Sequence, residues 1–201
     1  MDRKSALVAS ALALAASAAS AAITFTPSGS VTFSQMFDPD GGVFAAGAYT
    51  SGQYGTFSST AAGTFSLTYL GQESAYSDGV RIVVAGRSLT EGNHVGDWIS
   101  GPMTAGAALD FTFFGSEGSS STNGGSATPH ATFTLLGTNV TTRAGTFAYV
   151  IGYNDSALHD DWDDFVIGLN PTAPVPEPQT YALLLAGLGV IGFVARRRQA
   201  R

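Results

Sequence analysis

An acidic segment in the last third of the chain carries the residues best suited to chemistry. Residues 152–165 read Gly-Tyr-Asn-Asp-Ser-Ala-Leu-His-Asp-Asp-Trp-Asp-Asp-Phe, with five carboxylates close together. Carboxylates this close repel one another unless water or a cation neutralises them, and Ca²⁺ takes about six to eight oxygen ligands that Asp-rich loops supply. The pattern predicts either a solvated acidic turn before the last strand or a Ca²⁺ site with four candidate ligands: Asp155, Asp161, Asp163 and Asp164.

Groups for acid–base or nucleophilic catalysis are present but form no recognisable constellation. Three histidines fall in loop-like sequence without the spacing of metal ligands: His94, His130 and His159. Asp97 lies near His94 and could orient its imidazole, while Asp110 and Glu117 could pair for glycoside hydrolysis. Such arrangements are recognised by geometry, so the sequence alone predicts no catalytic residue and a protein that is not an enzyme.

Composition excludes several other kinds of site. The chain has no Cys, which excludes disulfides, Cys-ligated zinc and a Cys nucleophile. Residues 22–174 hold thirteen acidic side chains against three basic ones: Arg81, Arg87 and Arg143. Because affinity for nucleic acid comes mainly from Lys and Arg that release counterions, we expect no nucleic-acid partner.

A β-rich domain over residues 23–170 must position these groups. It is rich in Gly, Ser, Thr, Phe and Tyr, and aromatic and β-branched residues favour strands while Gly favours turns. We expect strands near residues 23–26, 30–37, 53–59, 63–70, 79–85, 109–114, 131–136, 146–152 and 164–169. Short strands without helical periods between them predict an all-β fold, an antiparallel β-sandwich that is jelly-roll-like.

Several of these strands alternate apolar and polar residues, which predicts one buried face and one face in water. The residues expected to face the core are Phe65, Leu67, Tyr69, Phe111, Phe113, Phe133, Leu135, Phe165, Ile167 and Leu169. Their polar neighbours, such as Thr132 and Thr134, are expected in water. The Gly/Ser-rich stretch 115–129 is expected to be an exposed, mobile loop. Trp98 and Trp162 are either core residues or platforms on which a sugar could stack.

The N-terminus has the three parts of a secretory signal peptide. A basic pair at residues 3–4 precedes an apolar run over 6–16, and small residues follow. This order predicts a signal helix over residues 1–22, exported by the Sec machinery and cleaved after Ala21 or Ala22.

The C-terminal region, residues 171–201, begins as a Pro-rich linker and then turns apolar. Two prolines hold extended a motif that consists of Val175, Pro176, Glu177 and Pro178. The apolar run 181–195 would form a helix of about 22 Å, against a hydrocarbon core of about 30 Å. We expect a transmembrane-like helix that spans the membrane with local thinning. A basic cluster would mark its cytoplasmic side: Arg196, Arg197 and Arg198.

These three parts in this order, over residues 175–198, resemble the PEP-CTERM sorting domain, which is also catalogued as the ice-binding protein C-terminal domain. The resemblance implies that exosortase, a membrane-embedded transpeptidase-like Cys enzyme, recognises the tail at Pro176, Glu177 and Pro178. It also implies a Gram-negative host that makes exopolysaccharide and biofilm matrix.

The acidic segment resembles a segment that recurs in exoproteins with this tail, Gly-Tyr-Glu-Asp followed by a loop and Asp-x-Asp-Tyr-Asn-Asp. The last four positions of that pattern are occupied here by Asp161, Trp162, Asp163 and Asp164. Asn154 stands where that pattern has Glu and His159 where it has its first Asp, and both departures weaken the argument that the segment binds an ion.

Together these features predict an exported protein of the cell surface or extracellular matrix, structural or adhesive in role and associated with exopolysaccharide. The alternative is a secreted carbohydrate-binding module or glycan-active hydrolase on the same sorting signal. Ice binding would require flat, regularly spaced rows of Thr, and Thr24, Thr26 and Thr112 are too isolated to form them.

Overall fold

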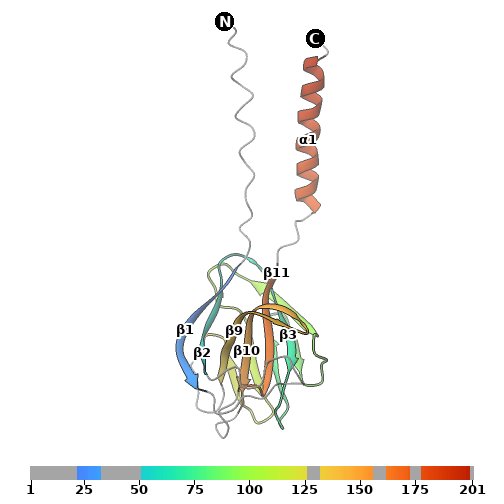
Figure 1. Cartoon of the computed structure of the whole chain (residues 1–201). Helices are drawn as coiled ribbons and strands as arrows, with labels where there is room; N and C mark the ends of the chain where they lie inside the picture. The colour runs from blue at the N-terminus through green and yellow to red at the C-terminus, as the bar shows by residue number, and fades with distance from the viewer. Residues whose placement is uncertain (1–21, 33–50, 126–131, 156–161, 173–177, 200–201) are drawn as a thin grey trace.

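Two antiparallel β-sheets face each other across a shared core (Figure 1). The computed structural model describes residues 22–32, 51–125, 132–155, 162–172 and 178–199. Within these residues one sheet has seven strands in the order β1-β2-β9-β10-β11-β3-β6, and the other has four in the order β5-β4-β7-β8. The prediction of an all-β, antiparallel fold is confirmed, while the jelly-roll-like connectivity stays a prediction.

Most of the strands lie near their predicted positions. In the described residues they are β1 (Ile23–Thr32), β2 (Ser51–Ser59), β3 (Gly63–Gly71), β4 (Asp78–Ile82), β5 (Arg87–Thr90), β6 (Trp98–Met103), β7 (Thr112–Gly115), β8 (Ser120–Thr122), β9 (Thr132–Thr142), β10 (Gly145–Asn154) and β11 (Phe165–Thr172). The sequence did not predict β5, β6 and β8. These strands are short, and β6 contains a Gly-Pro pair that is typical of a turn.

The core between the sheets is rich in Phe. The ring of Phe113 in β7 stacks on Tyr153 of β10 at a centroid distance of 5.1 Å and lies 5.9 Å from Phe133 of β9. Because β7 belongs to the small sheet and the other two strands to the large one, these contacts join the sheets. The predicted alternation is confirmed for a set of buried residues: Phe65, Leu67, Tyr69, Phe111, Phe113, Phe133, Phe165, Ile167 and Leu169. Burial of one such side chain stabilises the fold by roughly 1.5–3 kcal/mol.

Part of the outer face of the large sheet is also covered. The ring of Phe147 in β10 lies across Gly168 of β11, where a Cβ atom would collide with it. Leu70, Leu136, Val150, Trp162 and Val166 complete this second apolar cluster. Thr132 and Thr134 are buried rather than exposed, so the prediction that they face water was wrong. Alternation within one strand does not reveal what packs on its outer face.

The Gly/Ser-rich stretch 115–129 is not simply an exposed loop. It contains β8, which pairs with β7, and the buried Asn123, which bonds two distant segments. The amide of Asn123 accepts a hydrogen bond from the Phe57 N–H at 2.8 Å and donates to the carbonyls of Phe57 and Leu109, both at 2.8 Å. Composition alone misassigned this stretch because the structural role of Asn123 depends on hydrogen-bond partners that lie far away in the sequence.

Strand β11 runs past the predicted end of the domain into the expected linker. Pro171 pairs with Phe65 of β3, although Pro has no N–H to donate. The neighbouring Asn170 side chain makes bonds to β10 instead, accepting from the Ala148 N–H at 2.7 Å and donating to the Thr146 carbonyl at 3.0 Å.

The helix in the described part of the C-terminal region is α1 (Pro178–Gln199), which includes the whole apolar run 181–195. Among the described residues, no helix combines the length and the apolar character that crossing a membrane requires. The transmembrane-like character predicted for this segment is therefore not supported. The predicted signal helix lies outside the described residues, apart from Ala22.

Candidate functional site

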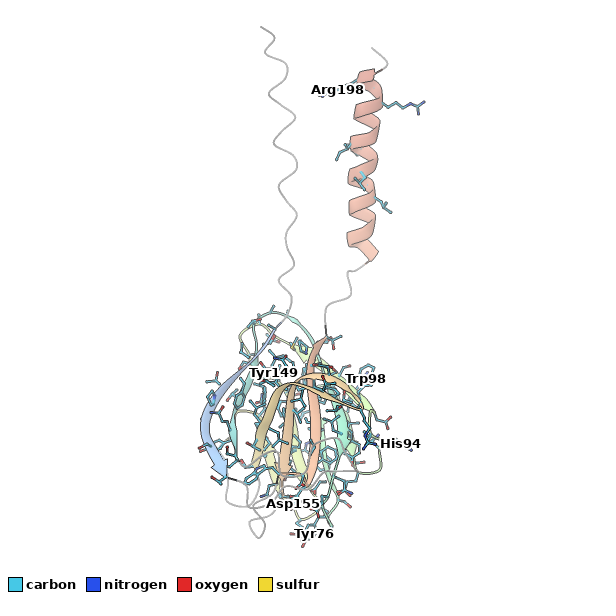
Figure 2. All side chains as sticks on the ribbon, in the orientation of Figure 1. Tyr76, His94, Trp98, Tyr149, Asp155 and Arg198 are labelled. Atoms are coloured by element: carbon cyan, nitrogen blue, oxygen red, sulfur yellow. The ribbon has the colours of Figure 1, made fainter. Side chains whose placement is uncertain are left out.

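The predicted sorting motif lies in sequence between β11 and α1. Val175, Pro176 and Glu177 lie outside the described residues, and Pro178 is the first residue of α1. Pro is favoured in the first helical turn because the N–H that it lacks would have no intrahelical acceptor there. At the other end of α1, three exposed Arg side chains occupy the last turn, where positive charge interacts favourably with the helix dipole: Arg196, Arg197 and Arg198. Figure 2 shows Arg198 at this end of the helix.

Four buried aspartates lie at one end of the sandwich, which we call the acidic end: Asp78, Asp155, Asp163 and Asp164. Figure 2 shows Asp155 at this end with Tyr76, whereas Tyr149 lies toward the other end. As whole residues, Asp155, Asp163 and Asp164 are all at least nine-tenths buried. The solvated-turn interpretation was therefore wrong for these three residues. Asp161, the fourth predicted ligand, lies outside the described residues.

Hydrogen bonds connect the chain segments of the acidic end. The Asp155 N–H donates to Asp164 Oδ2 at 2.8 Å, which ties the end of β10 to the start of β11. The Glu73 N–H donates to the Asp163 carbonyl at 3.0 Å. The acidic segment is thereby fixed to the loop that follows β3.

Asp78 is the member of this end that the sequence analysis missed. It opens β4, is 1% exposed, and its backbone N–H donates to Glu91 Oε1 at 2.8 Å. Neither carboxylate oxygen of Asp78 accepts a well-aligned hydrogen bond from a described residue, although the nearby Ser74 hydroxyl lowers its pKa. Burial, followed by the charge of Asp155, raises the pKa of Asp78 to about 7. In the sequence, Asp78 is a single Asp before a Gly, and no motif around it indicated that it would be buried at the acidic end.

Gly115, at the end of β7, leaves room for the oxygens of the acidic end. A Cβ atom there would lie 2.6 Å from Asp78 Oδ1, 2.5 Å from Ser119 Oγ and 3.5 Å from the Asp155 Cβ. The Tyr153 hydroxyl donates to the same Ser119 Oγ at 3.0 Å. Burial is the main cause that raises the pKa of Tyr153 far above its usual range, so this phenol stays protonated. Oxygen atoms from β4 and from the β7–β8 turn thus meet above the Cα of Gly115.

No three His, Cys, Asp or Glu side chains in the described part of the chain are gathered closely enough to hold a metal ion among themselves. The predicted Ca²⁺ site in the segment 155–164 includes Asp161, which the structure does not describe. A Ca²⁺ ion bound by that segment therefore stays a prediction.

The candidate catalytic groups take part in turn contacts. His94 Nδ1 lies 3.8 Å from Asp97 Oδ2, with the histidine side chain 95% exposed. Asp97 accepts a hydrogen bond from the His94 backbone N–H at 2.9 Å, and this bond is the main cause that lowers the Asp97 pKa. Asp110 accepts from the Val84 N–H at 2.6 Å. His130 and His159 lie outside the described residues.

The two tryptophans have opposite environments. Trp162 is buried in the outer apolar cluster, whereas Trp98, at the start of the edge strand β6, is 63% exposed. The sequence allowed each Trp to be either a core residue or a platform on which a sugar could stack. Trp162 is a core residue, and for Trp98 the platform stays a prediction.

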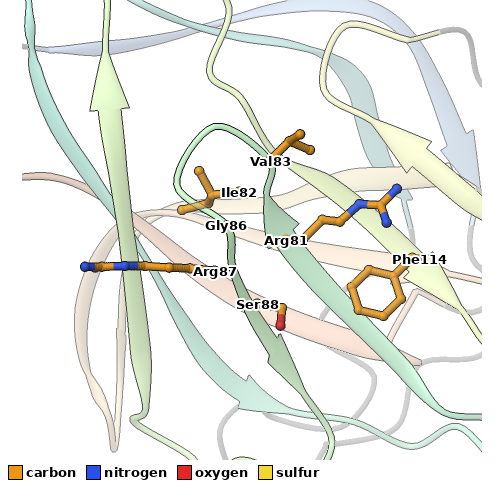
Figure 3. Close-up of a pocket in the computed structure, with 7 residues that line it drawn as sticks. All are labelled: Arg81, Ile82, Val83, Gly86, Arg87, Ser88 and Phe114. Atoms are coloured by element: carbon orange, nitrogen blue, oxygen red, sulfur yellow. The ribbon is translucent and has the colours of Figure 1, made fainter.

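A shallow, open pocket of about 430 Å³ lies beside the β4–β5 turn (Figure 3). Its lining residues are Arg81, Ile82, Val83, Gly86, Arg87, Ser88 and Phe114. The guanidinium carbon of Arg81 lies 5.6 Å from the centroid of the Phe114 ring, within the range of a cation–π contact. Arg87 points the other way and donates to the Ser100 hydroxyl at 3.2 Å. The pocket therefore presents one guanidinium beside an aromatic ring.

Comparison of this chain with known proteins gives a match in the C-terminal tail. Residues 174–198 match the family model of the PEP-CTERM protein-sorting motif. Neither the curated proteins nor the solved structures contain a match to this chain. PEP-CTERM signals are recognised by exosortase, and they indicate export with passage through a membrane before release at the surface or outside the cell. The resemblance of the tail is thus confirmed: residues 174–198 are a PEP-CTERM protein-sorting motif, and this motif indicates an exported protein that exosortase sorts.

Proposed function

We propose that this protein is a structural or adhesive component of the cell surface or extracellular matrix of a Gram-negative bacterium, and that it is not an enzyme. The Sec machinery would export it, residues 181–195 would hold it in the membrane during transit, and exopolysaccharide would be its matrix partner. The observation that carries the proposal is the match of residues 174–198 to the sorting motif.

Strand β11 links the acidic end to the tail. It begins at Phe165, next to the acidic end, and finishes at Thr172, three residues before the sorting motif. Eight residues at about 3.3 Å each give a strand of about 25 Å. A tail in the membrane would therefore leave the acidic end at the far, outward side of the sandwich.

Cell fractionation in the native host tests this proposal. We expect the protein in the surface or matrix fraction, accessible to antibody on intact cells, and retained in the inner membrane when exosortase is deleted. Recovery of the protein from the cytosol of exosortase-positive cells would contradict the proposal.

Carbohydrate binding is the second candidate, and the exposed Trp98 with the Arg81–Phe114 pair favours it. Aromatic faces and guanidinium groups recur where proteins hold sugars and their acidic substituents. A glycan array probed with the mature protein would show binding that Trp98→Ala or Arg81→Ala weakens about tenfold. A panel of hydrolase substrates on the same sample separates this candidate from the glycan-active hydrolase, because a binding module turns over none of them.

A further inference from the structure

The carboxylate of Asp78 has an unusual environment for a charged group. It is 1% exposed, and no described residue donates a well-aligned hydrogen bond to either of its oxygens, although the Ser74 hydroxyl and the Asp155 carboxyl lie near enough to affect its pKa. Its nearest charged neighbours, Asp155 and Glu91, carry the same sign. An ionised carboxylate in this position needs a positive charge, because burying it unpaired costs several kcal/mol.

The basic side chains of the described domain do not supply that charge. Asp78 lies on the inner side of β4 with Val80 and Ile82, whereas Arg81 lies on the opposite side against Phe114. Arg87 bonds to Ser100. Arg143 sits in the β9–β10 turn, about 30 Å of strand away from Asp155. The contact between a basic and an acidic side chain within 4 Å that is found among the described residues is the one between His94 and Asp97.

Oxygen atoms suited to a hard cation surround the same point. Asp78 Oδ1 and Ser119 Oγ lie close together over Gly115, 2.6 Å and 2.5 Å from the point that a Cβ atom of this residue would occupy, and the Asp155 Cβ lies 3.5 Å from the same point. The Ser74 hydroxyl reaches Asp155 Oδ2 at 3.5 Å, and the bond from the Asp155 N–H to Asp164 holds Asp155 in place. We infer that the carboxylates of Asp78 and Asp155 bind a divalent cation, Ca²⁺, whose remaining ligands are the nearby hydroxyls and water.

This site differs from the Ca²⁺ site that the sequence suggested, because its first ligand comes from β4, far from the acidic segment. Two carboxylates are few for Ca²⁺, which predicts weak binding, in the range of about 0.1–1 mM that is typical of extracellular modules. Ca²⁺ fits better than Mg²⁺ because it accepts irregular sets of oxygen ligands, whereas Mg²⁺ demands a near-ideal octahedron. The ion would join β4 of the small sheet to β10 of the large sheet.

Thermal unfolding of the full chain in detergent tests this inference. We expect CaCl₂ at 10 mM to raise the melting temperature by about 3–6 °C over EGTA at constant ionic strength, with MgCl₂ giving less than half of that shift. Asp78→Asn should abolish the Ca²⁺ response, and Gly115→Ala, which places a methyl group among the ligands, should reduce it. Asp97→Asn, which changes a carboxylate of the exposed β5–β6 turn, is the matched control and should respond like the wild type.

A direct probe covers the case in which Asp78→Asn fails to fold. Tb³⁺ added to the wild-type protein should give luminescence sensitised by the nearby Tyr153 and should be displaced by millimolar Ca²⁺. Equal melting temperatures of the wild type in EGTA and in 10 mM CaCl₂, together with no sensitised emission, would overturn the inference. A proton shared by Asp78 and Asp155 would then be what neutralises these two carboxylates. An unchanged Ca²⁺ response in Asp78→Asn would overturn it as well.

Discussion

The tail and the acidic end of the sandwich differ in how far apart in sequence their parts lie. The sorting motif, the apolar run and the Arg cluster follow one another within residues 174–198. The acidic end joins Asp78 of β4 to Asp155 and Asp164, more than 70 residues later. The tail is a continuous sequence motif that does not depend on contacts with the folded domain. The acidic end, in contrast, forms only when the two sheets have packed together. We therefore expect changes in the tail to alter sorting without altering stability, and changes in the sandwich to do the reverse.

The largest expected effect comes from the tail. Glu177→Ala should abolish processing by exosortase, so that the protein accumulates in the inner membrane, while the melting temperature of the sandwich stays within about 1 °C. Immunoblots of cell fractions and thermal unfolding of the purified protein measure the two quantities. Glu117→Ala, at an exposed turn between β7 and β8, is the control and should be sorted normally. A large loss of stability in Glu177→Ala would contradict the expectation that changes in the tail leave the stability of the sandwich unaltered.

The next effect comes from Asn123, whose amide makes three hydrogen bonds to Phe57 and Leu109. Asn123→Ala leaves those buried backbone groups unpaired and should lower the free energy of unfolding by about 2–4 kcal/mol. Urea unfolding checks this value against Asn93→Ala, which loses two bonds, to the Thr90 N–H and to Asp97, in the part-exposed β5–β6 turn and should cost less than half as much. The fraction of folded Asn123→Ala that reaches the surface should equal that of the wild type. A sorting defect in the folded fraction would contradict the comparison.

The pH dependence of stability sharpens the comparison at Asp78. Its pKa is raised from 3.8 to about 7, so the folded state binds more protons than the unfolded state between these values. In EGTA, the contribution of this group to stability is then greatest below pH 4 and is lost as the pH rises through 7. Asp78→Asn should remove this loss, so that at pH 8 the free energy of unfolding of the variant exceeds that of the wild type by about 2–4 kcal/mol.

Urea unfolding at pH 4, 6 and 8 measures that difference. A gap between the two proteins that stays constant over this range would show that Asp78 keeps an ordinary pKa. The gap should also close when Ca²⁺ is added at pH 8, because the ion stabilises the wild type alone.

The smallest effect is expected at Asp97. Hydrogen bonding from the His94 N–H lowers the pKa of Asp97, so the stability it contributes is present above the ordinary value of 3.8 and is lost as the pH falls through the lowered pKa. Asp97→Asn should lower the melting temperature by about 1 °C at pH 7 and by less at pH 3, as differential scanning calorimetry can measure. A fall of several degrees would mean that the β5–β6 turn is a structural element of the sandwich rather than a surface feature.

Individual residues show which features of the fold could be predicted from the sequence and which could not. Phe65, Leu67 and Tyr69 alternate along one strand, so their burial could be predicted from spacing alone. The tail could be recognised for the same reason, since its three parts are adjacent. The burial of Thr134, the bonds of Asn123 and the position of Asp78 next to Asp155 all depend on contacts between strands that are distant in sequence. Neither composition nor periodicity reports such contacts, because strand order and sheet packing decide them.

The intact mass of the protein from its native host, with and without exosortase, tests the central claim most directly. If residues 174–198 are a sorting message separate from the sandwich, the mass in exosortase-positive cells should correspond to a C-terminus that has been processed near Pro176, Glu177 and Pro178. The mass in the deletion strain should then correspond to a chain that still contains residues 178–201. An identical mass that includes these residues in both strains, with the same distribution between cell fractions, would contradict the account.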